Sequence, residues 1–384
     1  MNSIYLDNAA TSQVRDEVID KMSAVLRSNY GNASSMHGYG RSSKSIIESC
    51  RKRIASHFNA LSSEIVFTAG GTEADNLVLH SAVRDLKVTH IITSKIEHHA
   101  VLHTVEQLAA EHKISVSYVD VLQNGIINYQ HLETLLKSSK KTLVTLMHVN
   151  NEIGTILDIQ KVADLCKSNS ALFHSDSVQS VGHYHLDLQT TPVDFLAASA
   201  HKFHGPKGIG FVYIRKNSGL KALIIGGTQE RGIRAGTESI HDIVGLDESL
   251  ALAYQNLASE KIHVRKLKTY FVEQLKLQIP NIKFNGSCCD SDISTYTLVN
   301  VCLPVTEANA PMFLFQLDLK GIACSKGSAC QSGSGKGSHV LAELLSEEDL
   351  KKPSIRFSFS IYNTKKEIDT VVDILKELIN STAS

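Results

Sequence analysis

Short apolar runs alternate with helix-length segments through the first half of this chain, and this alternation restricts the fold more than any other feature. The expected strands cover residues 65–68, 90–93, 116–121, 143–149, 171–174, 195–198 and 209–214. The expected helices between them include residues 73–86, 98–112 and 159–168. Strands that alternate with helices predict an α/β fold with a mostly parallel sheet flanked by helices. The last two strands are joined by a turn at Gly205 and need not be parallel.

The pattern changes after residue 240, where a long helical stretch runs to about residue 277. Beyond it we expect strands near residues 282–284, 297–303 and 355–360, with helices between and after them. These segments predict a smaller α/β domain, which we expect the N-terminal segment to complete. The predicted division is a large domain over residues 16–257 and a small domain built from residues 1–15 and 258–384.

Composition narrows the class of protein. The 384 residues are 42% hydrophobic and 20% charged, which suits a globular protein. Lys plus Arg and Asp plus Glu are both 39, so no overall charge attracts nucleic acid or an anionic membrane. No apolar run approaches the ~20 residues of a membrane span, and no signal-peptide pattern opens the chain. Seven cysteines without a disulfide spacing predict reduced thiols and a cytoplasmic location.

A lysine is expected at the end of one of these strands, inside the protein. Ser199-Ala200-His201-Lys202 comes directly after residues 195–198, and a Gly-Pro-Lys-Gly turn follows at 205–208. Burial of a lysine disfavours its charged form, so its pKa falls and the neutral amine becomes a nucleophile. Such an amine can form a Schiff base with a carbonyl cofactor. A lone lysine more often reaches from a strand end into water, so this prediction depends on the other motifs.

A glycine turn follows the strand expected at residues 65–68. Gly70 and Gly71 allow close approach of a ligand to the backbone, and Thr72 opens the next helix. Free N–H groups at a helix start suit a phosphate. An ordinary turn with Thr72 as the helix cap fits the same residues equally well.

Polar residues also follow other expected strands. Asp176 ends one strand and can pair with a protonated pyridine nitrogen, although it would serve equally well as a helix cap. Gln179 lies three residues on and can donate to a ring oxygen. Asn151 can bond a ring hydroxyl or a substrate carboxylate, or can belong to a solvated turn.

His98 opens a helix, where an imidazole can stack on a flat cofactor ring and shuttle a proton near neutral pH. A zinc site built from His98, His99 and His103 is disfavoured, because adjacent histidines point in different directions on a helix and no cysteine or carboxylate set joins them. We therefore predict no metal.

Two arginine-bearing segments have the character of anion sites. Residues 226–237 are rich in glycine, carry two arginines and end at Thr237. Arg356 lies among apolar residues, and a buried arginine favours a bidentate anion such as a substrate carboxylate. A structural salt bridge at Arg356 is equally compatible with the sequence.

Cys330 lies where an expected strand gives way to a run of small residues, within a loop at about 324–338. A cysteine in such a loop is expected to be exposed and mobile, and its thiolate can act as a nucleophile. Most cysteines are simply packed in cores, and we expect that for Cys50, Cys166 and Cys302. Cys324 is ambiguous and could be a second thiol near this loop.

Together these motifs resemble the pyridoxal-phosphate-dependent cysteine desulfurases of the NifS/IscS type, in the aminotransferase class V group of fold-type I enzymes. The resemblance runs from Tyr5-Leu6-Asp7-Asn8-Ala9-Ala10-Thr11 to Arg356, in the order of the family. It is carried by the motifs Thr-Glu-x-x-Asn, Asn-Asn-Glu-x-Gly, Ser-x-His-Lys, Arg-x-Gly-Thr and Gly-Ser-Ala-Cys.

The resemblance implies a role for each candidate residue. Lys202 would hold pyridoxal 5'-phosphate covalently, with Asp176 at the pyridine nitrogen, Gln179 at the ring oxygen and His98 stacked on the ring. The phosphate would be held by Gly71, Thr72, Ser199 and His201, with Thr237 reaching it from the other subunit of a homodimer. Asn151 and Arg356 would bind the amino-acid substrate.

The implied reaction converts L-cysteine to L-alanine. Lys202 would remove the α-proton, and the sulfur would be captured as a persulfide on Cys330 for transfer to an acceptor protein, a scaffold or a sulfurtransferase. Members of this family supply iron–sulfur cluster assembly or tRNA thiolation. Ser360 and the residues after it depart from the family pattern, and the tail after the last helix is short, which leaves the acceptor open.

Two other activities share most of these features. A selenocysteine lyase would use nearly the same residues. A class V aminotransferase or lyase without sulfur transfer would use Lys202, Asp176 and Thr72 but would not need Cys330. A binding module without catalysis is disfavoured by the intact Lys202, Asp176, His98 and Cys330.

Overall fold

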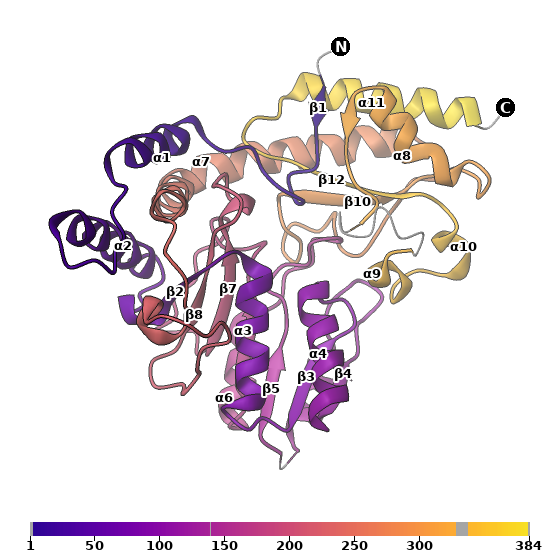
Figure 1. Cartoon of the computed structure of the whole chain (residues 1–384). Coiled ribbons are helices and arrows are strands. Elements are labelled where there is room, and N and C mark those ends of the chain that lie inside the picture. Colours follow the sequence, from indigo (N-terminus) through magenta and orange to yellow (C-terminus); the bar gives the residue numbers. More distant parts are fainter. Residues whose placement is uncertain (1–2, 139, 328–336, 383–384) are drawn as a thin grey trace.

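The computed structural model describes residues 3–138, 140–327 and 337–382. Its larger part is built around a seven-stranded sheet with the strand order β2-β8-β7-β6-β5-β3-β4 (Figure 1). The strands are β2 (Ile65–Thr68), β3 (His90–Ser94), β4 (Ser115–Val119), β5 (Thr142–Thr145), β6 (Leu172–Asp176), β7 (Phe195–Ser199) and β8 (Gly210–Ile214). Strands β4, β3, β5, β6 and β7 pair in parallel, whereas β8 runs antiparallel to both β7 and β2. The predicted mostly parallel sheet is therefore confirmed.

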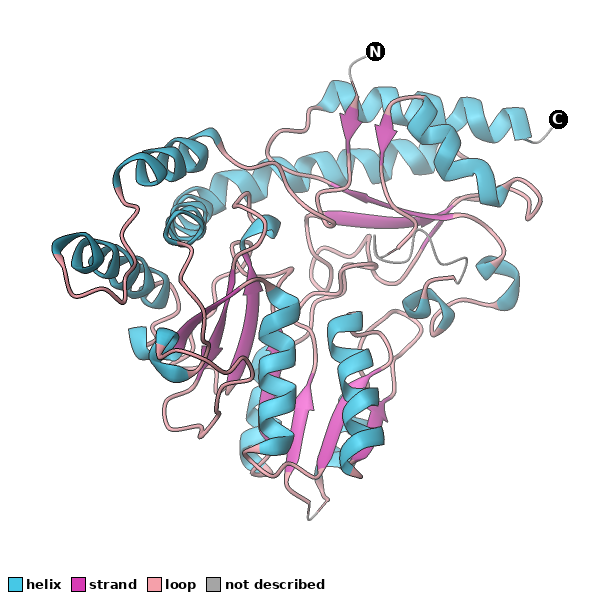
Figure 2. Cartoon of the chain, in the orientation of Figure 1, coloured by secondary structure: helices cyan, strands magenta, loops and turns pink. Residues whose placement is uncertain are grey.

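Helices cover both faces of this sheet (Figure 2). One face packs against α3 (Gly71–Arg84) and α4 (His99–His112) through a buried apolar cluster. The other face packs against a second cluster contributed by α2 (Gly38–Ser56), α5 (Tyr129–Leu136), α6 (Ile159–Ser168) and the first half of α7 (Ile240–Gln278). Neighbouring strand residues such as Ile91 and Ile92 belong to different clusters, as the alternation of side chains along a strand requires.

The C-terminal part has a core of its own, which includes the second half of α7. Its sheet has the order β12-β10-β9 and is antiparallel. The strands are β9 (Lys283–Phe284), β10 (Leu298–Cys302) and β12 (Ser354–Ser358). The helices of this part are α8 (Ala310–Leu319), α9 (His339–Ala342), α10 (Glu347–Leu350) and α11 (Lys365–Thr382).

The N-terminal segment joins the C-terminal part before it enters the large one. Strand β1 (Ile4–Tyr5) pairs in parallel with β11 (Ile322–Ala323), and helix α1 (Asp16–Ser28) follows (Figure 1). Ala9 N–H donates to Ser358 Oγ at 2.8 Å, so this segment runs along β12. The division of the chain at residues 15 and 257 stays a prediction.

Two expectations about local structure need correction. The strand expected at residues 143–149 ends at Thr145, although the N–H groups of Leu146 and His148 still bond to His174 O and Asp176 O of β6. Lys202 lies not in the strand but in a short 3₁₀ turn, Ala200–Lys202, directly after β7. None of the helices in the described ranges is both long and apolar enough to cross a membrane.

Candidate functional site

A cavity of about 250 Å³ lies at the carboxyl ends of β5, β6 and β7. In open parallel sheets this edge is where ligands bind. The cavity brings together almost all of the predicted site residues: Gly71, Thr72, His98, Asn151, Asp176, Gln179, Ser199, His201, Lys202 and Arg356. Residues of the large part and of the C-terminal part therefore line one cavity, although Gly71 and Arg356, for example, are 285 positions apart in sequence.

The Lys202 amine lies at the wall of this cavity. Its Nζ donates to Ala9 O at 2.6 Å and to Ala10 O at 2.7 Å, so the N-terminal segment fixes the end of the side chain. The expectation of a fully buried lysine was wrong, because the side chain is only half-buried in the turn that follows β7. Carbonyl oxygens accept from an ammonium group, so these two bonds fix the position of the amine at the cavity wall.

Asp176 is the last residue of β6, and its side chain lines the cavity. Its Oδ1 accepts from Val178 N–H at 3.0 Å, so the chain turns at this point without starting a helix. Burial raises the pKa of Asp176, while His98 and Lys202 act in the opposite direction. A cationic group in the cavity would therefore lower the free energy of the ionised carboxylate. Gln179 donates from Nε2 to Ala9 O at 2.9 Å.

His98 is the N-cap residue of α4, and its Nδ1 accepts from Ala100 N–H at 3.2 Å. Burial lowers the pKa of His98, with the negative charge of Asp176 opposing this shift. A neutral ring held at one nitrogen is suited to stacking on a flat aromatic group. The neighbouring rings of His99 and His103 stack on each other at 4.6 Å, and no group of metal-ligating side chains occurs among the described residues.

The start of α3 has the properties of a phosphate site. Its N-cap is Gly70, at φ 153°, and no side chain caps the helix, which excludes the alternative of a Thr72 cap. The first N–H groups of α3 are therefore open to an anion. A Cβ on Gly71 would lie 2.5 Å from Val178 Cγ2, so only glycine lets the backbone sit this close to the segment after β6. His201 is here as well, and burial lowers its pKa to about 4.

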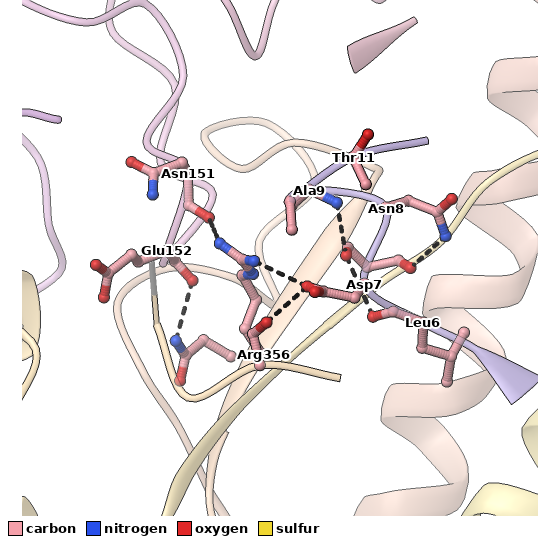
Figure 3. A network of polar contacts seen from close by, with 12 residues as sticks. Leu6, Asp7, Asn8, Ala9, Thr11, Asn151, Glu152 and Arg356 are labelled. Carbon is pink, nitrogen blue, oxygen red and sulfur yellow. Dashed lines mark hydrogen bonds and ion pairs between the residues drawn. The ribbon is translucent and has the colours of Figure 1, made fainter. Parts of the chain in front are cut away.

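Arg356 of β12 closes the cavity from the C-terminal part, with an exposed fraction of 1%. Its Nη1 donates to Asn151 O at 2.7 Å, and its Nη2 forms an ion pair with Asp7 Oδ1 at 3.0 Å (Figure 3). The structural salt bridge that the sequence left open is thus present. The Nε of Arg356 is buried and has no partner among the described residues.

Asp75 also lines the cavity and was not predicted from the sequence. This residue is fully buried on α3, and its Oδ1 lies 3.4 Å from His174 Nε2. Burial raises the pKa of Asp75 and lowers that of His174 to about 3, so both groups favour their neutral forms. The sequence does carry a trace of this residue, since Asp75 lies one helical turn from the buried Gly71 and Leu79, on the apolar face of α3.

Two predicted residues do not line the cavity. Thr237 is exposed, lies in the segment before α7 and is not among the residues that line the cavity of its own chain. Cys330 lies outside the described residues, which end at Gly327 and resume at Gly337.

Comparison with known proteins places this geometry in a family. The sequence profile of class V aminotransferases matches residues 4–371. The chain belongs to the class V aminotransferase family. Cysteine desulfurase IscS of Dictyoglomus turgidum is 38% identical over 381 residues, which are 98% of this chain and 94% of that protein. This class V enzyme is therefore dependent on pyridoxal 5'-phosphate and has cysteine desulfurase activity, as predicted.

Solved structures agree on the fold. A NifS-like protein superimposes with a TM-score of 0.90 at 32% identity, covering 99% of this chain and all of that one. A structure described as SspA in complex with cysteine gives a TM-score of 0.80 at 31% identity, covering 94% of this chain and 99% of that one. The predicted fold-type I architecture is thereby confirmed.

The residues present fit pyridoxal 5'-phosphate. The cofactor needs an amine for its aldehyde, an anion opposite its ring nitrogen and a cradle for its phosphate. In this cavity Lys202 provides the amine, Asp176 provides the anion and the uncapped start of α3 provides the cradle for the phosphate.

Proposed function

We propose that this cysteine desulfurase binds its cofactor in the cavity around Lys202. Lys202 would bond the cofactor aldehyde, Asp176 would face the pyridine nitrogen, Gln179 would face the ring oxygen and His98 would stack on the ring. Gly71, Thr72, Ser199 and His201 would hold the phosphate. The observation that carries this proposal is the convergence of the Lys202 amine, the Asp176 carboxylate and the open start of α3 on one cavity of about 250 Å³.

When bound, the cofactor supplies an electron sink for the α-carbon of an amino acid. Lys202 Nζ takes the α-proton of L-cysteine and can return a proton to the product. Arg356 pairs with the substrate carboxylate, which its fork-shaped guanidinium suits, and Asn151 adds a hydrogen bond. The bonds from Lys202 Nζ to Ala9 O and Ala10 O support this use, because they fix the end of the side chain at the wall of the cavity.

Cys330 captures the sulfur. Its thiolate attacks the sulfur of the bound cysteine, so an S–S bond forms while the Cβ–S bond breaks and leaves its electron pair on carbon. Protonation of that carbon gives L-alanine. L-cysteine and the Cys330 thiol thus become L-alanine and a Cys330 persulfide, without any external oxidant.

The enzyme acts as a homodimer and passes its sulfur to an acceptor protein, a scaffold or a sulfurtransferase, for iron–sulfur cluster assembly or tRNA thiolation. Support for the dimer comes from Thr237, which is exposed and does not line the cavity of its own chain. In the proposed dimer Thr237 reaches the phosphate held by the other subunit. A cytoplasmic location stays a prediction.

The test is mass spectrometry of Cys330 after incubation with L-cysteine, with L-alanine measured in the same samples. We expect a mass increase of one sulfur atom on the Cys330 peptide. C330S should keep the absorbance of bound cofactor but form no persulfide, and its alanine production should fall at least a hundredfold, on the order of what loss of a covalent nucleophile costs. Cys289 is exposed and does not line the cavity, so C289S is the matched control and should behave as wild type. Full activity of C330S would refute the role of Cys330.

A further inference from the structure

Asp75 is a buried acid to which the proposed function gives no role. It lies on α3 with an exposed fraction of 1%, and it lines the same cavity as Asp176. Its Oδ1 is buried and has no hydrogen-bond partner among the described residues. Because an ionised carboxylate is costly to bury without a partner, a carboxyl group in this position favours its protonated form.

The charges around Asp75 favour the same form. Burial raises the pKa of Asp75, and the negative charges of Asp176 and Glu97 raise it further. Asp176 differs, because His98 and Lys202 oppose the effect of its burial. When the surroundings of two neighbouring carboxyl groups differ in this way, one group keeps its proton while the other carries the charge.

The other ionisable groups nearby do not bring a cation to Asp75. Burial lowers the pKa of His99 and His201 to about 4 and that of His174 to about 3. These three rings are therefore neutral at neutral pH. Arg356, across the cavity, is already held in an ion pair.

The position of Asp75 connects the two ends of the proposed cofactor site. Asp75 lies one helical turn after Gly71, on the same face of α3. On β6, His174 and Asp176 project to the same side, because they are two positions apart in a strand. Asp75 Oδ1 lies 3.4 Å from His174 Nε2, and His174 Nδ1 lies 2.8 Å from Thr145 Oγ1 of β5. Polar contacts therefore run from the helix proposed to hold the phosphate to the strand that ends at Asp176.

We propose that Asp75 is a positioning residue that, in its protonated form, holds α3 against β6 through His174 and so sets the separation between the start of α3 and Asp176. The proposal rests on the proposed binding of the cofactor in this cavity. The protonated carboxyl donates to His174 Nε2, and the ring then donates from Nδ1 to Thr145 Oγ1. An asparagine can make the same donation from its amide, whereas an ionised carboxylate can only accept.

The first measurement is the affinity of the full-length protein for pyridoxal 5'-phosphate, followed by the absorbance of bound cofactor. D75A and H174L should each weaken binding roughly tenfold or more, because each removes one partner of a buried polar contact. The double variant D75A/H174L should bind no more weakly than the weaker single variant, since both changes remove the same contact. D75N should stay within about threefold of wild type, because its amide replaces the donor.

S81A is the matched control for this titration. Ser81 is buried on the same helix, but it donates to Lys221 O and does not line the cavity, so S81A should bind the cofactor as wild type does. Wild-type affinity in D75A would overturn the positioning role, even if D75A unfolded at a lower temperature without cofactor. Fully additive losses in the double variant would also overturn it.

The second measurement reports the protonation of Asp75 and needs no activity. Infrared spectra of cofactor-loaded wild type and D75N are subtracted at neutral pH. We expect the C=O stretch of a neutral carboxyl group in wild type and its loss in D75N, whereas S81A should keep it. Carboxylate stretches in this difference spectrum, or a cofactor affinity of D75N as low as that of D75A, would overturn the protonated form.

K202A separates failure of this inference from failure of the proposed function. Lys202 is proposed to bond the cofactor, so K202A should lose the absorbance of covalently bound cofactor. If K202A keeps that absorbance, the proposed site is wrong, and so is the role of Asp75. If K202A loses it but D75A binds the cofactor like wild type, only the inference about Asp75 is wrong. Should D75A fail to fold, D75S replaces it, because the serine hydroxyl is too short to reach His174.

Discussion

The guanidinium of Arg356 is divided between two partners, with Nη1 bonded to Asn151 O and Nη2 paired with Asp7. A lysine at this position can reach one of these groups as a point charge but cannot hold a carboxylate in a two-pronged contact. We therefore expect R356K to raise the KM for L-cysteine roughly tenfold or more, which corresponds to about 1.5–3 kcal/mol for a lost charged hydrogen bond. The kcat should fall less. Steady-state kinetics with L-cysteine measures both parameters.

A suitable control is R215K. Arg215 bonds to the carbonyl of Val193 and lies outside the cavity, so its replacement by lysine should leave the KM unchanged. If R356K instead lowered kcat alone, the role of Arg356 would be to orient the reacting groups rather than to bind the substrate.

A site residue could be predicted from the sequence where its own type and its place in a motif indicate its chemical role. Lys202, Asp176 and His98 follow or precede strand and helix ends, and the structure brings all three to one cavity. The carbonyl partners of Lys202 were not predictable, because they belong to the N-terminal segment almost 200 positions away. Asp75 was missed because an acidic residue inside an amphipathic helix normally indicates its solvent side.

The junction between α3 and the segment after β6 is the element on which the proposed phosphate site depends. A Cβ on Gly71 would lie 2.5 Å from Val178 Cγ2, and at the first position of a helix alanine is otherwise well tolerated. We expect G71A to lower the free energy of unfolding by about 1–3 kcal/mol through overpacking, and to weaken cofactor binding. Thermal unfolding and titration of the cofactor absorbance measure the two effects.

The double variant G71A/V178A provides the control for this steric argument. With the backbone in its present place and Cγ2 of Val178 removed, the nearest remaining atoms lie 3.8 Å or more from the new Cβ at position 71. Both the free energy of unfolding and cofactor binding should therefore largely recover. Failure of V178A to rescue G71A would mean that Gly71 is needed for close approach of the ligand itself.

Elements with a clear period were predicted well. Helix α6 has the bounds that the sequence indicated, and the strands β2, β7 and β8 agree to within a residue at each end. Strand β5 was predicted to extend four residues too far, because Leu146, Met147 and Val149 are apolar and buried for a different reason: they belong to the loop that leads to Asn151 at the cavity. Hydrophobicity reports burial, and burial does not distinguish a strand from a packed loop.

At the scale of the whole molecule, the N-terminal segment joins the two halves around the cavity. Ile4 and Leu6 belong to the C-terminal core, whereas Ser12 donates to His201 O at 2.8 Å in the large part. Arg15 then pairs with Glu260 of α7 through two hydrogen bonds of 2.8 Å. The sequence predicted that the N-terminal segment would complete the small domain, but not that it would supply the carbonyl groups that hold Lys202, since such contacts depend on the relative placement of the two cores.

Buried titratable groups make the stability of the whole molecule depend on pH in two opposite ways. Burial lowers the pKa of His148 and His204 to about 4 and that of His174 to about 3. Burial raises the pKa of Glu97 to about 8, although Ser94 and Met147 N–H donate to its carboxylate. The histidine contribution is fully present above the unfolded pKa near 6.5 and is lost as pH falls toward 4. The Glu97 contribution is fully present below about pH 4.5 and is lost as pH rises toward 8.

We therefore expect the free energy of unfolding to decrease as the pH falls below about 6, where the three histidines outweigh Glu97. It should decrease more gently as the pH rises from 6.5 to 8. Denaturant unfolding at half-unit pH intervals measures this profile. E97Q should remove up to about 1 kcal/mol per pH unit from the decrease on the alkaline side and should make the decrease below pH 6 steeper, because the opposing contribution of Glu97 is lost there too, whereas H148Q should reduce the acid decrease by a similar amount. An E97Q profile parallel to that of wild type between pH 6.5 and 8 would mean that Glu97 ionises in the folded enzyme at its ordinary pKa, and that Ser94 and Met147 offset the burial of its charge.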